Sequence, residues 1–537
     1  MIILKNNHGF PWTKRNNIYI KGYFYNENRE IPVEEIFSLI EKNIDSLEDL
    51  YPKIRGNFLI VVEKEEKEYT ILADKLRSFP LLYSFDKEWI LSDTALSLKE
   101  ELESREILLT VNQEALREFK MCSFTLGHHT LYENISRINS CSVLNLKEDG
   151  SSKEKRFREI FDLCEDHKCL EEEIDEIPKI LEKILKRIIA TAKSRNKQLI
   201  VPLSGGQDSR LIIHTLAQLQ AENILCYTYG TKSSPEVQIS KKIAEFYNYP
   251  WKFVEYTPDK WKNFIARDDF KELLAAANQF ISTPHIQEYM ALKELLRQGY
   301  LEKGGIILPG FSGDFLQGSN IPPYFIVEEN ISWKNFYEEV KGQYFSHILW
   351  DEDMKSHEDE TRESIRKKSE FITSSLPWRE VLNRYERFGF EDRKLKFIVN
   401  SCRVYELFGL EWRTPLWNEE YFHFWKGVPE KRYARELHYL YTQKYQKELQ
   451  EYLGSAPKHP ALPKADLTHF IRKYFPNVFQ NIKHKKNHRE LLKKYKADPY
   501  GWFLICDDRE WEKYKNKVYS VNSIVSLKTS DALDIKY

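Results

Sequence analysis

Short runs of β-branched and aromatic residues, bounded by charged and turn-forming segments, are the main pattern in the first 150 residues. Such runs predict β-strands, and we place them at residues 18–20, 56–62, 69–72 and 89–91. The polar segment 149–153 is typical of a turn and predicts a boundary. We therefore expect a first, β-rich domain over residues 1–150.

The pattern changes at 171–193, where apolar residues recur at helical spacing and predict a helix. Downstream, apolar runs predict strands at 199–203, 224–229, 251–256 and 305–308, and amphipathic segments predict helices at 209–220, 236–246 and 286–297. Strands that alternate with helices of this length form βαβ units around a parallel sheet. We therefore predict an α/β fold for this part, and a mainly helical structure beyond residue 325.

The chain has 537 residues, too many for one ordinary hydrophobic core, which predicts two or more domains. Its 81 Lys and Arg nearly balance its 82 Asp and Glu, so no overall charge attracts it to nucleic acid or to a membrane surface. The N-terminus lacks a signal-peptide pattern, and no apolar run approaches the roughly 18 residues that a membrane span needs. We expect a soluble, cytoplasmic protein with no nucleic-acid and no membrane partner.

Seven cysteines are scattered along the chain, at positions 122, 141, 164, 169, 226, 402 and 506. An odd number without regular spacing argues against a disulfide framework. Cys164 and Cys169 have no second pair at the spacing of zinc ligands, so we predict no zinc site there. Free, mostly buried thiols are the expectation.

The most informative segment is Ser204-Gly205-Gly206-Gln207-Asp208-Ser209, between the apolar run 199–203 and a predicted helix. Adjacent glycines allow a tight turn whose N–H groups face an anion, and the start of a helix favours negative charge. Asp208 is misplaced beside an anion unless Mg²⁺ bridges the two, a role that suits a carboxylate. No Lys follows the glycines, unlike in the GxxxxGK[ST] loop. This loop therefore suits pyrophosphate as a leaving group while the α-phosphorus of a nucleotide is attacked.

The string SGGxDS at 204–209 resembles the ATP-pyrophosphatase signature of the asparagine synthetase superfamily, and the likeness covers most of the chain. Residues 309–314, Pro-Gly-Phe-Ser-Gly-Asp, stand where that family has its second motif, SGEGSDE. The resemblance implies a Rossmann-like adenine nucleotide α-hydrolase (ATP pyrophosphatase) fold over residues 170–475, followed by a helical C-terminal extension over 476–537. It implies ATP and Mg²⁺ as cofactors, with Asp208 and Asp314 as catalytic metal ligands. The ATP-binding residues that it implies are Leu203, Ser204, Gly205, Gly206, Asp208, Ser209, Tyr229 and Gly310.

Two further segments fit this family. Residues 233–236 resemble the Ser-Pro-Asp that follows its second strand, and residues 409–416 resemble its GVExRxPF segment. Within the latter, Glu411 and Arg413 are either substrate contacts or a buried structural pair, and the sequence leaves both open.

The N-terminal region resembles the glutamine-hydrolysing domain of the same family, a class II glutamine amidotransferase domain with an Ntn-type α+β sandwich. The matching segments are 56–58, 74–83 and 92–93. Such domains work through an N-terminal Cys, whose freed α-amine activates the thiolate. Here position 2 is Ile2, and the first cysteine is Cys122. We therefore predict a degenerate domain without glutaminase activity, kept as a structural or docking element.

The second motif departs from the family at two positions. Asparagine synthetases have a Glu after its first glycine that manages amine protons, and β-lactam synthetases have a Tyr, whereas this chain has Phe311, which exchanges no proton. Phe315 replaces the second acidic residue. The family's closing loop carries a Lys that stabilises charge in amide formation. Lys464 is our first choice for this catalytic residue and Lys458 the second, with surface lysines as the alternative for both.

The expected function is that of an asparagine-synthetase-like, AMP-forming ligase that adenylates a carboxylate and then forms an amide. Its small-molecule partners are that carboxylate and an amine or ammonia, either free or supplied by a separate enzyme. The chain also resembles homologues from surface-polysaccharide clusters, whose expected product is an amidated sugar acid. An intramolecular cyclase of the β-lactam synthetase or lasso-peptide cyclase type and a non-catalytic nucleotide-binding protein stay as alternatives. The sequence leaves the oligomeric state open, a homodimer included.

Overall fold

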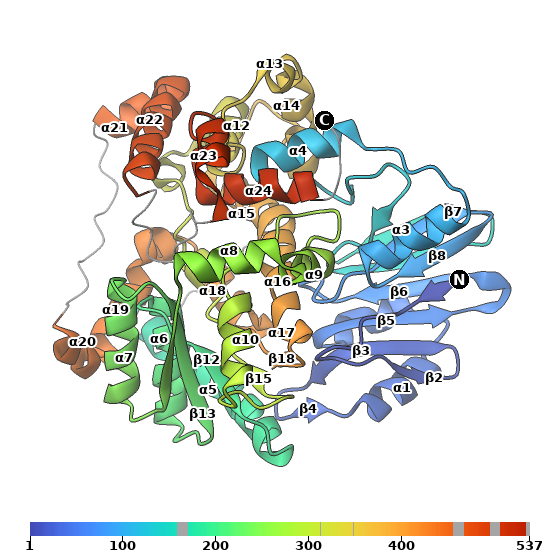
Figure 1. Ribbon diagram of the computed structural model, residues 1–537, viewed down its shortest axis with the longest axis horizontal. Helices are drawn as coiled ribbons and strands as arrows, with labels where there is room; N and C mark the ends of the chain where they lie inside the picture. Colours follow the sequence, from blue (N-terminus) through green and yellow to red (C-terminus); the bar gives the residue numbers. More distant parts are fainter. Residues whose placement is uncertain (158–169, 312, 347, 455–466, 495–504, 533–537) are drawn as a thin grey trace.

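The computed structural model describes residues 1–157, 170–311, 313–346, 348–454, 467–494 and 505–532. Figure 1 shows the N-terminal sheets in blue on the right, a parallel sheet in green beside them and the C-terminal helices in red above. The predicted α/β class and the strand-rich N-terminal part are therefore confirmed.

The N-terminal region contains two sheets. In the larger sheet all neighbours are antiparallel, in the order β11 (Ser152–Arg156), β10 (Ser142–Leu146), β6 (Tyr69–Ala73), β5 (Gly56–Glu63), β3 (Ile18–Tyr25) and β2 (Thr13–Arg15), with β4 (Glu30–Ile31) beside β3. The smaller sheet has the order β1 (Ile2–Ile3), β8 (Glu88–Ser92), β7 (Leu82–Asp86) and β9 (Ser136–Arg137). All four predicted strands of this region are present.

Strand β5 lies between two hydrophobic layers. Its alternate side chains point to opposite faces of the sheet. Phe58 and Ile60 enter a core with helix α1 (Val33–Lys42), whereas Leu59 and Val61 enter the core that continues into the rest of the chain. This alternation makes the sheet a buried layer that joins the N-terminal region to the remainder of the molecule.

The second part of the chain is built on a parallel sheet. Its order is β14 (Trp251–Glu255), β13 (Ile224–Gly230), β12 (Leu199–Pro202), β15 (Ile306–Ile307) and β18 (Glu411–Trp412). The chain leaves β12 towards β13 and later returns on its other side at β15. The carboxyl ends of β12 and β15 therefore flank a topological switch point, where open α/β sheets bind ligands.

Helices cover both faces of the parallel sheet. Leu199 and Val201 of β12 pack with helices α5 (Leu170–Ser194), α6 (Gln207–Gln218) and α7 (Pro235–Phe246). Ile200, on the opposite face, packs with helices α8 (Pro258–Ala266), α9 (Asp268–Ala277) and α10 (Tyr289–Arg297). The predicted strands and helices are found within a few residues, although β15 is shorter than the predicted strand 305–308 and α10 begins three residues after the predicted position.

The predicted boundary at residue 150 falls within the β10–β11 hairpin, because the polar segment 149–153 forms the end of its turn and the start of β11. The N-terminal sheet therefore continues to Arg156. The C-terminal helix α24 (Val521–Ala532) packs beside α4 (Gln113–Cys122), and Ser526 Oγ donates a hydrogen bond of 2.6 Å to Ser123 Oγ. One hydrophobic core thus contains residues of all three expected parts. The division into 1–150, 170–475 and 476–537 stays a prediction.

Residues beyond 325 are mainly helical, as predicted, from α12 (Trp333–Tyr344) to α24. One feature of this region was not predicted. Strands β16 (Asn330–Ser332) and β17 (Ser375–Pro377) form a two-stranded antiparallel sheet. At three residues each, these strands are too short for a hydrophobic pattern to reveal.

Arg413 joins the parallel sheet to the N-terminal sheet. It follows β18 and is 1% exposed. Its Nε and Nη2 atoms donate to the two carboxylate oxygens of Glu30 at 2.7 and 3.0 Å, and Nη2 also donates to Glu411 at 3.0 Å. Its guanidinium lies 3.7 Å from the ring centroid of Tyr23. Of the two alternatives for Glu411 and Arg413, the structure therefore favours the buried structural pair.

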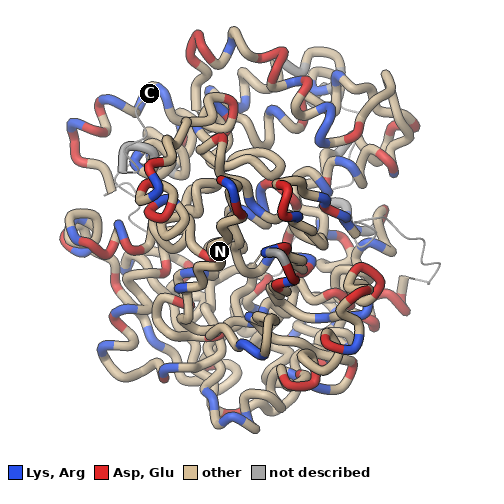
Figure 2. Tube along the Cα trace, turned by 90° about the vertical axis from the view of Figure 1, so that its right-hand side faces the viewer, with Lys and Arg blue, Asp and Glu red and all other residues tan. Residues whose placement is uncertain are grey.

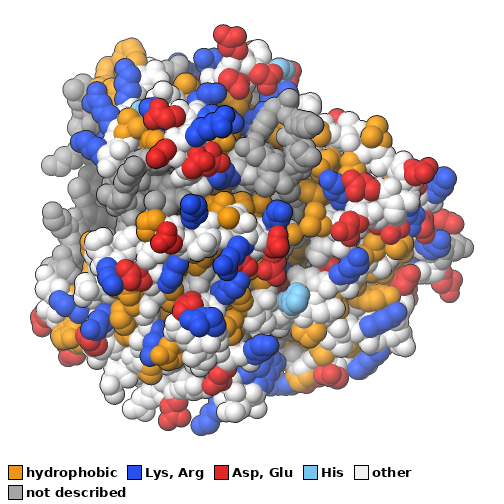
Figure 3. All heavy atoms as spheres, in the orientation of Figure 1, with side chains coloured by type: hydrophobic (Ala, Val, Ile, Leu, Met, Phe, Trp, Pro, Cys, Tyr) orange, Lys and Arg blue, Asp and Glu red, His pale blue; other side chains and the backbone are white. Residues whose placement is uncertain are grey.

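The charges of the surface are mixed. Basic and acidic positions are interspersed along the trace in Figure 2 and over the face of the molecule shown in Figure 3. None of the helices in the described part of the chain combines the length and apolar character needed to cross a membrane. The described cysteines are free and buried, as predicted, at positions 122, 141, 226, 402 and 506; Cys164 and Cys169 lie outside the described residues.

Candidate active site

A cavity of about 350 Å³ lies at the switch point of the parallel sheet. Its wall comes from the loop after β12, the end of β13, the loop after β15, and residues near α10, α17 (Arg403–Leu407) and Arg435. The structure brings the residues implied for ATP and Mg²⁺ together here: Leu203, Ser204, Gly206, Asp208, Ser209, Tyr229, Gly310 and Asp314 line the cavity. Gly205 faces helix α7, where a Cβ would lie 3.4 Å from the Cα of Glu236.

Hydrogen bonds of Ser204 and Ser209 hold the loop after β12 in its conformation. Ser204 N–H donates to Ser209 Oγ at 3.2 Å, the two hydroxyl oxygens are 3.1 Å apart, and Gly206 N–H donates to Ser204 Oγ at 3.1 Å. Gly206 is the N-cap of α6. The first N–H groups of a helix have no partner within it and carry a partial positive charge. This loop therefore presents hydroxyl and N–H donors to an anion at the end of β12.

The two motifs touch at positions where only glycine fits. A Cβ on Gly310 would lie 2.9 Å from Ser209 N, and a Cβ on Gly313 would lie 2.9 Å from Asp208 Cγ. This close approach allows the N–H of Asp314 to donate to Asp208 Oδ2 at 2.9 Å. The loops after β12 and β15 thus hold their two aspartates side by side, although the residues are 106 positions apart.

The charge of Asp208 is the main electrostatic feature of the cavity. Burial raises the pKa of its carboxyl to about 6, the neighbouring guanidinium of Arg435 opposes that rise, and the charge of Asp314 adds to it. Arg435 Nη2 donates to Asp208 Oδ1 at 3.1 Å and also bonds to Gln317. Asp208 is therefore ionised at neutral pH and attracts a cation.

The oxygen atoms of Asp208 and Asp314 fit Mg²⁺, a hard cation that prefers one or two carboxylates together with waters and phosphate oxygens. Asp314 Oδ2 accepts a hydrogen bond of 3.0 Å from Ser319 Oγ, which orients its carboxylate. Within the described ranges, no group of three or more His, Cys, Asp and Glu side chains is placed to hold a metal. The pair therefore suits a cation that shares its coordination with a phosphate ligand.

Two cations that interact with these aspartates, Arg435 on the cavity wall and Lys394, were not found from the sequence. Arg435 is the last residue of the 3₁₀ segment Glu430–Arg435 and lies outside every motif. Lys394 lies on the π-helix Gly389–Ile398; burial lowers its pKa to about 8, and the charges of Asp314 and Asp208 oppose that shift. Segments of π-helix are frequent at functional sites. Both side chains add positive charge beside the two aspartates.

Beside Phe311 the cavity wall also contains a group of buried polar side chains that no sequence motif indicates. The ring of Phe311 stacks on Tyr405, with centroids 6.1 Å apart. Tyr405 Oη donates to Glu288 Oε2 at 2.5 Å and Tyr227 Oη donates to Glu288 Oε1 at 2.9 Å. Glu288 is 3% exposed, and burial raises the pKa of its carboxyl.

The structure does not test every prediction that the sequence makes for this site. Lys464 and Lys458 lie outside the described residues, so the assignment of the closing-loop lysine stays a prediction. Phe315, on α11 (Gly313–Leu316), is buried and stacks on Phe390 with centroids 6.0 Å apart. It occupies the position of the family's second acidic residue as a packing residue.

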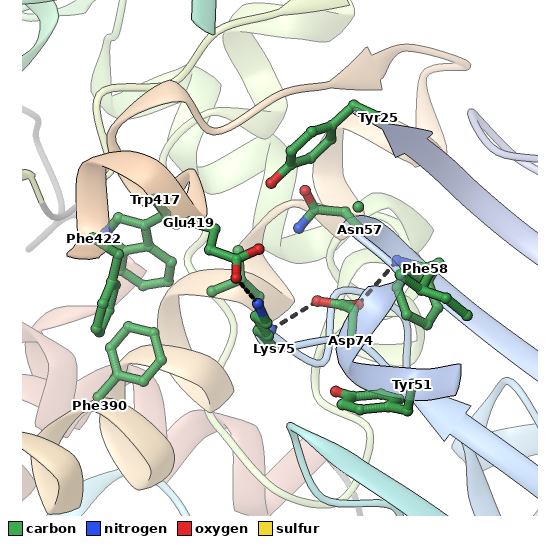
Figure 4. Close-up of a pocket in the computed structure, with 13 residues that line it drawn as sticks. Tyr25, Tyr51, Asn57, Phe58, Asp74, Lys75, Phe390, Trp417, Glu419 and Phe422 are labelled. Carbon is green, nitrogen blue, oxygen red and sulfur yellow. Dashed lines mark hydrogen bonds and ion pairs between the residues drawn. The ribbon is translucent and has the colours of Figure 1, made fainter. Parts of the chain in front are cut away.

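The segment that resembles the glutaminase motif has a structural role. Asp74 accepts hydrogen bonds from the N–H groups of Leu76 at 2.7 Å and Phe58 at 3.1 Å, and Lys75 forms an ion pair with Glu419. Figure 4 shows these residues around a small cavity, with Tyr51 and Phe58 on one side and the rings of Phe390, Trp417 and Phe422 on the other. Its volume of about 20 Å³ is enough for a water and too small for glutamine.

Cys122 is the first cysteine of the chain. It is fully buried, and burial raises the pKa of its thiol well above its ordinary value. A protonated, buried thiol is unreactive.

Comparisons with known proteins agree with this geometry. The asparagine synthase family matches residues 181–449, half of the chain, and this range contains the parallel sheet, both motifs and Arg435. A search among curated proteins returned no match. The members of the matched family are ATP-utilising, amide-forming ligases. The chain belongs to the asparagine synthetase superfamily, as this family match shows, and the switch-point cavity and the paired aspartates agree with it.

Proposed function

We propose that this protein uses ATP to activate a substrate carboxylate as an acyl-adenylate, releases pyrophosphate, and then passes the acyl group to an amine. The observation that carries the proposal is the contact between the two motifs. Asp208 and Asp314 lie side by side, 2.9 Å from backbone N to carboxylate, next to a loop of anion-binding N–H groups. This combination suits the β- and γ-phosphates of a nucleotide as a leaving group.

The residues of the loop have distinct roles in the first step. The N–H groups at the start of α6 and the hydroxyls of Ser204 and Ser209 bind the pyrophosphate portion, and Arg435 adds a cation at the same end. Asp208 and Asp314 would hold Mg²⁺, which neutralises the triphosphate charge when it is bound. The substrate carboxylate attacks the α-phosphorus, and the bond to pyrophosphate breaks. Leu203, Tyr229 and Gly310, which line the same cavity, would contact the adenosine portion.

In this proposal the N-terminal region does not supply the amine. Its second residue is Ile2, and its first cysteine, Cys122, is buried with a protonated thiol. The amine is then free ammonia, ammonia from a separate enzyme, or an amine on a second substrate. A sugar acid of surface-polysaccharide synthesis is the proposed carboxylate class, on the sequence resemblance alone.

The test is pyrophosphate release from Mg·ATP in the presence of a panel of carboxylates, including aspartate, glutamate and uronic acids. Wild type should release pyrophosphate and AMP with at least one of them, and Asp208→Ala should not. The control is Asp45→Ala, which removes an exposed carboxylate elsewhere. If no carboxylate gives release above Asp208→Ala and ATP does not bind, the proposal fails.

Other outcomes identify the alternatives. ATP binding without pyrophosphate release by any carboxylate would indicate a nucleotide-binding protein without catalysis. Release that requires a carboxylate and an amine in the same molecule would indicate an intramolecular cyclase. Mass spectrometry of the product separates the second case from an intermolecular ligase, because cyclisation removes one water from a single substrate.

A further inference from the structure

The amide-forming step needs a proton acceptor, and position 311 does not supply one. A neutral amine that attacks a carbonyl carbon becomes positively charged and must lose a proton before a stable amide forms. Phe311 has no group that accepts a proton, yet it lines the cavity directly after Gly310. Other described residues of the cavity wall are candidates for this role.

Glu288 and Tyr405 meet the geometric requirements for that role. Both line the same cavity as Asp208, Ser209 and Phe311. Tyr405 lies directly against Phe311, with the two rings inclined by 22°. Its hydroxyl is hydrogen-bonded to Glu288 Oε2 at 2.5 Å, so a proton that reaches Tyr405 has a short path to the carboxylate.

The surroundings of Glu288 are unusual for a structural carboxylate. Among the described residues, the hydrogen-bond partners of its carboxylate are the hydroxyls of Tyr405 and Tyr227, and no cation forms an ion pair with it. A buried charge without a cationic partner is costly to the fold. Of the other titratable groups in its surroundings, Tyr256 and Cys402 are neutral at physiological pH because burial raises both of their pKa values. His285, which lines the same cavity, is neutral as well because burial lowers its pKa to about 4. Perturbed carboxyls in such cavities are typical of functional sites.

We propose that Glu288, acting through the hydroxyl of Tyr405, accepts the proton that the attacking amine loses during amide formation. This inference rests on the proposed function and assigns its second step. The amine nitrogen forms a bond to the carbonyl carbon of the acyl-adenylate, and the bond from that carbon to the AMP phosphate oxygen breaks, with its electron pair leaving on AMP. The surplus proton on nitrogen passes to Tyr405 Oη while the Tyr405 proton passes to Glu288 Oε2. Glu288 ends the step protonated and returns the proton to water when the products leave.

This arrangement predicts that the two half-reactions respond differently to mutation. Adenylation depends on the phosphate loop and the aspartates, whereas proton acceptance is needed only when the amine attacks. Glu288→Gln keeps the shape and removes the proton acceptor, and Tyr405→Phe keeps the ring against Phe311 and removes the hydroxyl. Both variants should leave adenylation nearly unchanged and slow amide formation.

The experiment measures the two steps separately with a carboxylate that supports pyrophosphate release. Exchange of labelled pyrophosphate into ATP reports adenylation. Single-turnover amide formation, after the preformed adenylate is mixed with ammonium chloride or hydroxylamine, reports the second step. For both variants we expect exchange within about threefold of wild type and amide formation slower by roughly 100-fold or more, the usual contribution of a general base. The wild-type amide rate should rise with pH through the titration of Glu288, and Glu288→Gln should lack that rise.

The matched control is Glu118→Gln. Glu118 is also buried, at 2% exposure, and burial raises the pKa of its carboxyl to about 7, but it accepts a hydrogen bond from Leu126 N–H outside the cavity. This variant should change neither half-reaction. If Glu288→Gln does not fold, as judged by its melting temperature, Tyr405→Phe decides the question alone.

Each remaining outcome contradicts the inference. Amide formation within threefold of wild type in both variants would overturn it, as would an equal loss of exchange and amide formation, which indicates a structural role. Wild-type exchange without amide or hydroxamate from either nitrogen nucleophile would overturn it too. Absence of exchange with every carboxylate would instead refute the proposed function itself, and with it this second step.

Discussion

Replacing Asp208 with Asn should make the ligand-free protein more stable at neutral pH while it abolishes activity. The carboxylate of Asp208 is costly to the fold, because its side chain is only 16% exposed and the single guanidinium of Arg435 does not fully offset its loss of hydration. An uncharged side chain of the same shape removes that cost. Asn also keeps an oxygen that accepts the N–H of Asp314.

The magnitude follows from the pKa of this carboxyl, which the fold raises from 3.8 to about 6. A raised folded-state pKa means that the contribution of the group to stability is complete below the unfolded value and is lost as the pH rises through 6. Between pH 3.8 and 6 the wild type therefore loses about 3 kcal/mol that an uncharged residue keeps. For a chain of 537 residues the unfolding entropy is roughly 1 kcal/mol per kelvin, so the melting temperature should rise by about 3 °C.

The assay is the melting temperature of ligand-free wild type and Asp208→Asn between pH 4 and pH 8. We expect the difference to be near zero at pH 4, to appear between pH 4 and 6 and to be constant above pH 7. Asp45→Asn removes a charge from an exposed aspartate and should give no such curve. A lower or equal melting temperature for Asp208→Asn over the whole range would refute the argument that Asp208 is held in an ionised, costly state.

Three further predictions follow from the same contacts. Glu30→Ala should lower the free energy of unfolding by about 3 kcal/mol, because it leaves Arg413 buried with only one acidic partner. The control Glu27→Ala, at a side chain that is 69% exposed, should change the melting temperature little. Arg435→Met should weaken Mg·ATP binding by about tenfold or more, as measured by binding isotherms. As the pH is lowered, pyrophosphate release by this variant should be lost at a higher pH than in wild type, because Arg435 lowers the pKa of Asp208; a pH profile of the release rate checks this. Glutamine should not replace ammonium as the nitrogen source, since the Cys122 thiol is buried and protonated, and release of glutamate from glutamine would contradict this.

The phosphate loop could be predicted because its information is local. A short apolar strand, two glycines and a helix with Asp208 in its first turn determine the geometry within a dozen residues. Asp314 could be predicted because it follows another strand of the parallel sheet, and the carboxyl ends of parallel strands lie at the same edge. The structure places both at one cavity, as the alternation of strands and helices required.

The other half of the site could not be predicted, because it depends on packing between distant segments. Arg435 is 227 residues from Asp208, and Tyr405 is 117 residues from Glu288. A glutamate near the start of a helix and a tyrosine in an apolar stretch are unremarkable in sequence. Only the packing of α10 and α17 on one face of the sheet brings them together behind Phe311.

The central claim, that a substrate carboxylate attacks the α-phosphorus of ATP, is tested most directly by an oxygen label. The wild-type protein is incubated with Mg·ATP, an amine and a carboxylate that carries ¹⁸O in both oxygens, and the products are examined by mass spectrometry. The account predicts AMP that contains one ¹⁸O atom, because the bridging oxygen of the acyl-adenylate leaves with AMP. Unlabelled AMP, or ADP and phosphate in place of AMP and pyrophosphate, would contradict it.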